Sequence, residues 1–197
     1  MFAIDNKTKN GFEIIELKDL QGKTYAEIIP GCGGILHSFN IWHNGDYINV
    51  IDGYENKEDF DKNVASKGFK SCKLSPFACR IKNASYRFEA NTYRPDKFLL
   101  NGSALHGLIY DAPFTVTWQF ANDEHAGVAL EYKYRGENEG YPFHYDCVIT
   151  YHLKKDNELL VSTDIFNRDA DEGLIPVQDG WHPYFTLGGK IDDLLLQ

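Results

Sequence analysis

The chain has 197 residues, which is enough for one domain with a substantial core. Lysine and arginine number 20 and aspartate and glutamate 29, so the formal charge is −9. This acidic balance argues against nucleic acid or an anionic membrane as a partner, and more weakly against a phosphorylated substrate. Aromatic residues make up 14% of the chain, a share that favours strands and is also typical of sugar-binding surfaces.

The cysteines show neither a C-x-x-C pair nor a close His/Cys cluster. They are Cys32, Cys72, Cys79 and Cys147. We therefore expect free thiols in a reducing compartment rather than a zinc site or a disulfide framework. The first residues lack a basic stretch followed by an apolar one, and no run reaches the ~18–20 apolar residues of a membrane span. These observations predict a cytoplasmic protein.

The first part of the chain predicts two hairpins. Strands are expected over residues 12–17 and 24–30, separated by a turn-like stretch, and over 35–43 and 46–52, separated by Asn44-Gly45. The glycines of segment 31–34 predict a sharp turn. A phosphate-binding loop is the weaker alternative there, because the P-loop lysine and the G-x-G-x-x-G spacing are both missing. The charged segment 54–68 is expected to be a solvated surface loop that includes one helical turn.

The later part predicts strands in which every second residue is apolar. Each such alternation indicates a strand with one buried face. The apolar sets are Ala84, Tyr86, Phe88 and Ala90; Phe114, Val116, Trp118 and Phe120; Val128, Leu130, Tyr132 and Tyr134; and Phe143, Tyr145, Cys147, Ile149, Tyr151 and Leu153. A tight turn at Asp156-Asn157 leads into a last strand over 158–166. Regularly spaced strands without long helical periodicity predict an all-β fold, an antiparallel β-sandwich.

One histidine stands in an unusual setting, in the stretch from Gly180 to Gly189. His182 is flanked by Trp181, Tyr184 and Phe185, and Pro183 biases it towards extended backbone geometry. An imidazole can give or take a proton near neutral pH, so a fixed histidine facing a cleft is a candidate catalytic group. A packed structural histidine is the plainer interpretation of this stretch alone.

The chain ends in the apolar run Leu194-Leu195-Leu196-Gln197. Natural termini are usually polar, and a strand that stopped here would leave a neighbouring strand edge unpaired. We therefore expect residues 1–197 to form a single β-sandwich domain that is an N-terminal part of a longer domain.

Three segments, in this order, resemble the aldose 1-epimerase (galactose mutarotase) family. They are Leu74 to Ile81, Asn101-Gly102 followed by Leu105-His106-Gly107, and the tetrapeptide His182-Pro183-Tyr184-Phe185. Gly33-Gly34 also fits an early turn of this family. The resemblance implies a galactose mutarotase-like supersandwich, incomplete at its C-terminal end. It also implies an isomerase that interconverts the α and β anomers of a free hexose, such as galactose or glucose, with no metal or nucleotide cofactor.

The chain departs from the family pattern at several positions. Cys79 stands where asparagine is common, Leu108 where a second glycine is common, and Thr186 where asparagine follows the tetrapeptide. These differences bear on the sugar preference more than on the fold. The family's sugar-binding aspartate and its glutamate base lie well after the tetrapeptide, so we expect this chain to lack the catalytic base.

The resemblance assigns roles to three residues of this chain. His182 is the candidate acid that protonates the ring oxygen, and His106 would hydrogen-bond sugar oxygens near the anomeric carbon and assist proton transfer. Arg80 would bind ring or hydroxyl oxygens and fix the pose. Taken singly, Arg80 could be a surface ion pair and His106 a loop cap. The remaining histidines are expected to be structural or exposed; they are His37, His43, His125, His144 and His152.

Three alternatives to the epimerase remain open from the residues. The same sandwich could bind a sugar without converting it, which the expected lack of a base favours. A hexose-6-phosphate 1-epimerase would need a cluster of cations near the cleft, for which only Arg80 and Arg87 can be named. A purely structural sandwich would make the three ordered segments a coincidence.

Overall fold

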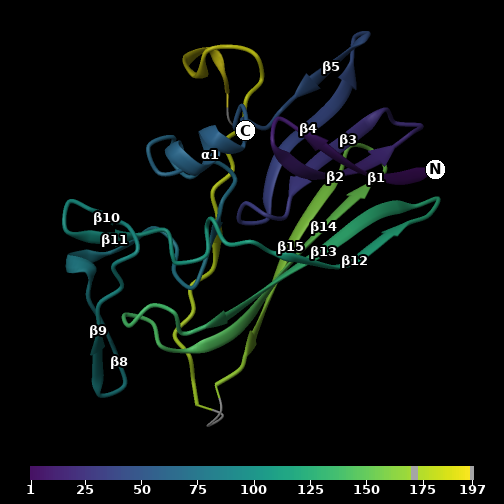
Figure 1. The fold of residues 1–197 in the computed structure, drawn as a ribbon. Helices are drawn as coiled ribbons and strands as arrows, with labels where there is room; N and C mark the ends of the chain where they lie inside the picture. The colour runs from purple at the N-terminus through teal and green to yellow at the C-terminus, as the bar shows by residue number, and fades with distance from the viewer. Residues whose placement is uncertain (170–172, 196–197) are drawn as a thin grey trace.

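The computed structural model describes residues 1–169 and 173–195, and every strand pairing in that part is antiparallel (Figure 1). The elements are β1 (Phe2–Lys9), β2 (Phe12–Asp19), β3 (Thr24–Ile29), β4 (Ile35–His43), β5 (Asp46–Asn49), α1 (Lys57–Asn63), β6 (Lys73–Leu74), β7 (Arg80–Ile81), β8 (Tyr86–Phe88), β9 (Asn91–Tyr93), β10 (Leu99–Leu100), β11 (Ser103–Leu105), β12 (Thr115–Ala121), β13 (His125–Arg135), β14 (His144–Lys154), β15 (Leu159–Asn167) and β16 (Gly180–Trp181). Short 3-10 turns cover Lys82–Ala84 and Ile191–Asp193.

Two larger sheets form the sandwich. One has the order β1-β2-β3-β4-β5 and the other the order β12-β13-β14-β15. Three small pairings, β10-β11-β7, β16-β6 and β8-β9, lie beside them. The predicted all-β antiparallel sandwich is therefore confirmed. The charged segment, expected to be a surface loop with one helical turn, instead forms the seven-residue helix α1, which buries Phe60.

Two-residue turns connect neighbouring strands of the first sheet. Asn44 and Gly45 both have positive φ, 50° and 90°, which is the backbone that a two-residue hairpin turn requires. Asn10 and Gly11, with φ of 53° and 79°, make the same kind of connection between β1 and β2. The predicted hairpins are confirmed, whereas β1 was not anticipated because its sequence is mostly polar.

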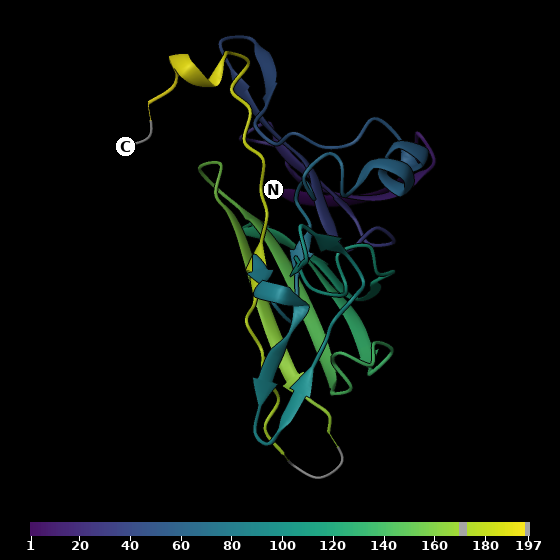
Figure 2. The ribbon, with the colours of Figure 1, turned by 90° about the vertical axis from the view of Figure 1, so that its left-hand side faces the viewer.

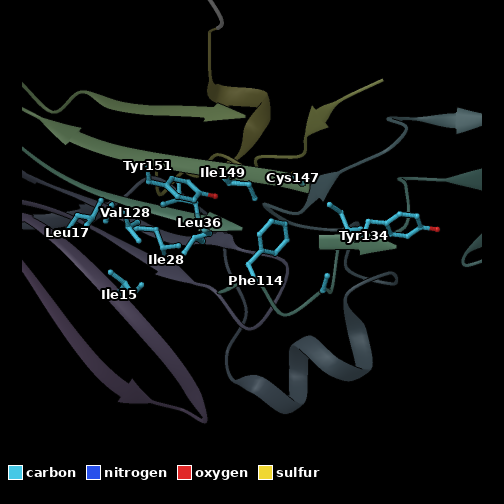
Figure 3. Packing of buried hydrophobic residues seen from close by; sticks show 14 of the residues in the cluster. Ile15, Leu17, Ile28, Leu36, Phe114, Val128, Tyr134, Cys147, Ile149 and Tyr151 are labelled. Atoms are coloured by element: carbon cyan, nitrogen blue, oxygen red, sulfur yellow. The ribbon is translucent and has the colours of Figure 1, made fainter. Parts of the chain in front are cut away.

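The main core lies between the two sheets (Figure 3). The first sheet contributes alternate side chains from β2 to β4, and the second contributes the predicted apolar faces of β13 and β14. Its central members are Leu17, Ile28, Leu36, Val128, Leu130, Ile149 and Tyr151. The Tyr151 hydroxyl donates a 2.8 Å hydrogen bond to the carbonyl oxygen of Gly34, so the predicted early glycine turn is tied to the second sheet.

The prediction for β12 is wrong in its buried face. The register shifts between Val116 and Trp118 through a β-bulge, so Trp118 pairs with Ala129 and Phe120 pairs with Gly127. An extra residue of this kind moves all following side chains to the opposite face of the sheet. Trp118 and Phe120 are 40% and 41% exposed instead of buried, and the other residues of this edge strand, Val116 included, are exposed as well, so β12 has no buried face.

The strand predicted over 84–90 is shorter than expected. Only Tyr86–Phe88 is a strand, and its alternation of half-buried Tyr86 and Phe88 with exposed Arg87 is as predicted. Ala84 and Glu89 have φ of 45° and 52°. Because a left-handed backbone cannot continue a strand, the predicted seven-residue strand is cut at both ends.

The segment after β15 runs back along the molecule towards β5 (Figures 1 and 2). Its backbone is hydrogen-bonded to two other loops on the way: β16 pairs with β6, and Tyr184 and Thr186 bond to Asp52 and Val50. The ammonium group of buried Lys73 contacts Asp179 and bonds to the Thr163 hydroxyl at 2.8 Å, which joins this segment to β15.

Part of the terminal apolar run, Leu196 and Gln197, lies outside the described residues. Leu194 and Leu195 are exposed. No helix within residues 1–169 and 173–195 combines the length and apolar character needed to cross a bilayer.

Truncating Leu130, which has no exposed surface, tests the core. Leu130→Ala is expected to lower the free energy of unfolding by about 2–5 kcal/mol, because the removed atoms leave a cavity between the sheets. Leu160→Ala, a matched control on β15 whose side chain is 44% exposed, should change it by no more than about 0.5 kcal/mol. Urea unfolding of both variants measures the difference, and equal losses would contradict this location of the core.

Candidate functional site

Arg80 and His106 are brought together by neighbouring strands. Arg80 begins β7 and pairs with Leu105 at the end of β11, so His106 follows directly beside it. The backbone N–H of His106 donates to the carbonyl oxygen of Cys79 at 2.9 Å. The two segments that resemble the family motifs therefore form one local structure.

The backbone around His106 adopts left-handed conformations. Cys79, His106 and Gly107 all have positive φ, of 54°, 61° and 78°. A Cβ on Gly107 would lie 2.3 Å from the carbonyl oxygen of Ser75, which also accepts the N–H of Leu108 at 2.8 Å. Glycine at 107 is thus required both by its φ and by close packing, and this packing fixes the direction of the preceding histidine.

His182 is held by backbone hydrogen bonds to the residues that precede β6. It follows β16 directly, its N–H donates to the carbonyl oxygen of Cys72 at 3.1 Å, and its own carbonyl oxygen accepts the N–H of Ser71 at 2.8 Å. Trp181 is part of the support, because its indole N–H donates to the Ser71 carbonyl oxygen at 3.1 Å. The imidazole is therefore carried by a residue whose backbone N–H and carbonyl oxygen are both hydrogen-bonded.

The two histidines meet in a row of rings. The centroids of His106 and His182 are 5.1 Å apart and their planes lie at 82°. Phe69 contacts His106 on the other side at 4.7 Å, and Tyr184 stacks on His182 at 5.4 Å with an interplanar angle of 22°. Each imidazole is thus packed between the other and an aromatic ring.

A hollow of about 550 Å³ opens at this row, between the end of α1 and the β10–β11 hairpin. Its lining residues are Lys62, Ala65, Ser66, Gly68, Phe69, Phe98, Leu100, Leu105, His106, His182 and Tyr184. Both predicted histidines line it. Arg80 is exposed beside His106 but is not part of this lining, and none of the other five histidines lines the hollow either.

The electrostatic setting favours a neutral His106. Burial lowers the pKa of His106 below its ordinary value of 6.5, and the neighbouring His182 and Arg80 lower it further. Its Nδ1 atom is buried and has no hydrogen-bond partner among the described residues. A neutral imidazole has one nitrogen that donates and one that accepts, so it can take part in proton transfer or hydrogen-bond a hydroxyl group of a ligand.

Several residues of the hollow were not identified from the sequence. Phe69, Ala65 and Ser66 lie in or next to the segment interpreted as a solvated charged surface, where no periodicity marks them. Tyr184, from the family tetrapeptide, also lines the hollow. Phe69 is marked in the sequence only by the preceding Gly68. A Cβ added to Gly68 would lie 2.2 Å from the Tyr184 hydroxyl oxygen, so the chain there packs closely against Tyr184.

Solved structures of similar shape share the mutarotase-like architecture. A galactose mutarotase-like protein from Clostridium acetobutylicum matches with a TM-score of 0.77 and 21% identity, over 93% of this chain and 54% of that one. The galactose 1-epimerase of Lactobacillus acidophilus matches with a TM-score of 0.71 and 20% identity, over 95% and 53%. A GalM/aldose epimerase homologue from C. elegans gives 0.70 and 18%, over 96% and 52%. The chain therefore spans about half the length of these structures.

The fold is that of the galactose mutarotase-like β-sandwiches. The aldose 1-epimerase family profile matches residues 15–197, and the chain belongs to this family. A search of curated proteins finds no significant match. The expected family and fold are thus confirmed, while the roles of Arg80, His106 and His182 remain predictions.

A pH titration of His106 tests the geometry of the pair. Followed by NMR, its pKa should lie below 6.5 and should rise in His182→Ala, because the substitution removes a neighbouring charge and opens the packing. The exposed His43→Ala is the matched control and should leave the titration unchanged. Since the unfolded chain takes up the proton first, His106 should lower stability as the pH falls through about 6.5. A pKa of His106 at or above 6.5 would refute the arrangement.

Proposed function

We propose that this chain forms the sugar-binding and acid-supplying part of an aldose 1-epimerase that acts on a free hexose. The observation that carries the proposal is the pair of imidazoles, 5.1 Å apart, on the wall of one hollow. Family membership supports a sugar epimerase, and the substrate and mechanism are our inference.

The reaction requires a proton to be given to the ring oxygen and another to be removed from the C1 hydroxyl group. As the C1–O5 bond breaks, its electron pair stays on O5 and a C1 carbonyl forms; rotation about C1–C2 and reversal of the step give the other anomer. In this proposal His182 protonates O5, His106 binds oxygens near C1, and Arg80 binds a hydroxyl group. Each general acid or base contributes about 10²–10⁴-fold.

The proposal leaves the base to be supplied from elsewhere. Among the described residues, those that line the hollow include no aspartate or glutamate. We propose that residues 1–197 are the N-terminal part of a longer domain and that a carboxylate beyond them acts as the base. The free thiols of all four cysteines support a cytoplasmic location.

A second candidate is a sugar-binding protein without catalysis, which the same lack of a carboxylate in the hollow favours. A hexose-6-phosphate epimerase has less support. Lys62 is the one lysine or arginine among the described residues that line the hollow, and burial of a phosphate against the apolar lining residues would be costly.

Polarimetry of fresh α-D-galactose and α-D-glucose, together with direct binding measurements, tests the proposal. We expect the chain to bind a free hexose, and any acceleration of mutarotation to fall about 10²–10⁴-fold in His182→Ala. His43→Ala is the control and should behave as the unmodified chain.

Binding without acceleration is the result expected of a part that lacks its base, and acceleration by a longer chain would then separate this proposal from the non-catalytic candidate. Acceleration that persists in His182→Ala would contradict the acid assignment. A folded chain that binds neither sugar would refute the proposed function.

A further inference from the structure

We propose that the protein has a second ligand site, on the face of the first sheet opposite the main core, and that this site binds a neutral cyclic molecule rich in hydroxyl groups. A hollow of about 440 Å³ lies there between β3, β4 and the loop that follows β5, and it is called the outer hollow below. Its lining shares no described residue with the hollow at His106 and His182. The inference therefore goes beyond the proposed function and does not depend on it.

An irregularity of β4 lies at the outer hollow. Ser38 pairs with Glu27 of β3, but Leu36 pairs with the residue that follows Glu27, so His37 is an extra residue in β4. Such a bulge bends the strand and re-aims side chains, and bulges are common beside functional sites. A Cβ on Gly53 would lie 2.5 Å from the carbonyl oxygen of His37, so the loop after β5 packs directly on the bulge. The bulge and this loop both line the outer hollow.

The polar side chains beside the bulge are buried and hold one another in place. Glu27, Ser38 and Asn40 are only 7%, 5% and 8% exposed. The Ser38 hydroxyl donates to Glu27 at 2.6 Å, and the Asn40 amide donates to the Ser38 oxygen at 2.9 Å. This is the one hydrogen bond that the Asn40 side chain makes with the described residues, whereas a primary amide can use two N–H groups and a carbonyl oxygen. A ligand would therefore meet a donor and an acceptor in a fixed position.

Charges of both signs line the outer hollow. They belong to Lys7, Lys9, Glu27, Asp52 and Glu55. Opposite charges lie close together, since the Lys7 ammonium group contacts both Glu16 and Glu27, the latter at 2.8 Å. A ligand with a net charge of either sign would be attracted by one set and repelled by the other. A hydroxyl group both donates and accepts, so it can bond to either set and to the Asn40 amide.

Tyr25 adds an aromatic ring to the same lining. It pairs with Asn40 across β3 and β4, so the ring and the amide are neighbours on one face of the sheet. The ring is fixed by an edge contact with Tyr47, with centroids 5.2 Å apart and planes at 68°. An aromatic side chain offers apolar surface to the C–H groups of a ring while nearby polar groups bond to its hydroxyls. This combination favours a cyclic sugar or polyol.

myo-Inositol and D-galactose are the probes. myo-Inositol carries a hydroxyl group on every ring carbon, but it has neither a ring oxygen nor an anomeric carbon on which the proposed epimerase could act. In NMR titrations, at least one of the two should give saturable shifts at the side-chain amides of Asn40 and Asn49 and at the N–H of Gly53, with a dissociation constant of about 1–10 mM. Inorganic phosphate, the charged comparison, should bind at least about tenfold more weakly.

Two variants of the lining and two controls locate the binding. Asn40→Leu should weaken it about tenfold, because the amide is lost. Glu55→Ala removes an exposed acceptor without touching the core and should weaken it about threefold, which keeps the test decisive if Asn40→Leu does not fold. Glu124→Ala, an exposed glutamate outside the lining, should leave the binding unchanged, and so should His182→Ala.

The outcomes separate this inference from the proposed function. The inference is overturned if neither probe gives saturable shifts at the outer hollow up to about 0.1 M, if phosphate binds there more tightly than both, or if Glu55→Ala and Glu124→Ala behave alike. Galactose shifts confined to His106 and His182 would overturn it and leave the proposed function standing. Saturable binding at the outer hollow without hexose binding at the histidine pair would support the inference and count against the proposed function.

Discussion

The site depends on the backbone hydrogen bonds that hold the segment from residue 178 to 186 against two loops. Gln178 bonds to Pro76, His182 to Cys72 and Ser71, and the chain then continues to Asp52 and Val50 beside the first sheet. The Lys73 ammonium group, buried and bonded to Asp179 and Thr163, adds a charged contact at the start of this path. Because such a group is costly to bury alone, the pairing specifies where the segment must lie. The position of His182 is thus determined by backbone bonds to parts of the chain more than a hundred residues earlier.

Much of the fold was predictable from local patterns. The alternation in β13 and β14 identified the inner face of the second sheet, and Asn44-Gly45 located a hairpin, because both signals arise from neighbouring residues. Two features of the backbone could not be predicted from the sequence pattern, for the same physical reason. The bulge in β12 inserts one residue at a place that no residue type marks, and everything after it changes face. The positive φ of Ala84 ends a strand whose alternation continues in sequence.

The site was predictable only in part. The order of three short segments pointed to Arg80, His106 and His182, and the structure places the two histidine rings in contact and the arginine on the adjoining strand. The wall of the hollow could not be predicted. Phe69 comes from a charged segment and Leu100 from a two-residue strand, and their proximity depends on contacts distant in the sequence. Short motifs therefore identified the two histidines, while the apolar residues that line the same hollow come together only through packing.

The left-handed backbone shared by Cys79 and His106 restricts which amino acids can occupy these positions. β-Branched side chains are strongly disfavoured at such φ values, whereas asparagine, aspartate, histidine and glycine are tolerated. A library randomised at residue 79 or 106 would accordingly be depleted of valine, isoleucine and threonine even if selected only for folding. The chemical variety open to evolution on this side of the pocket is thus limited by backbone geometry before any demand of catalysis applies.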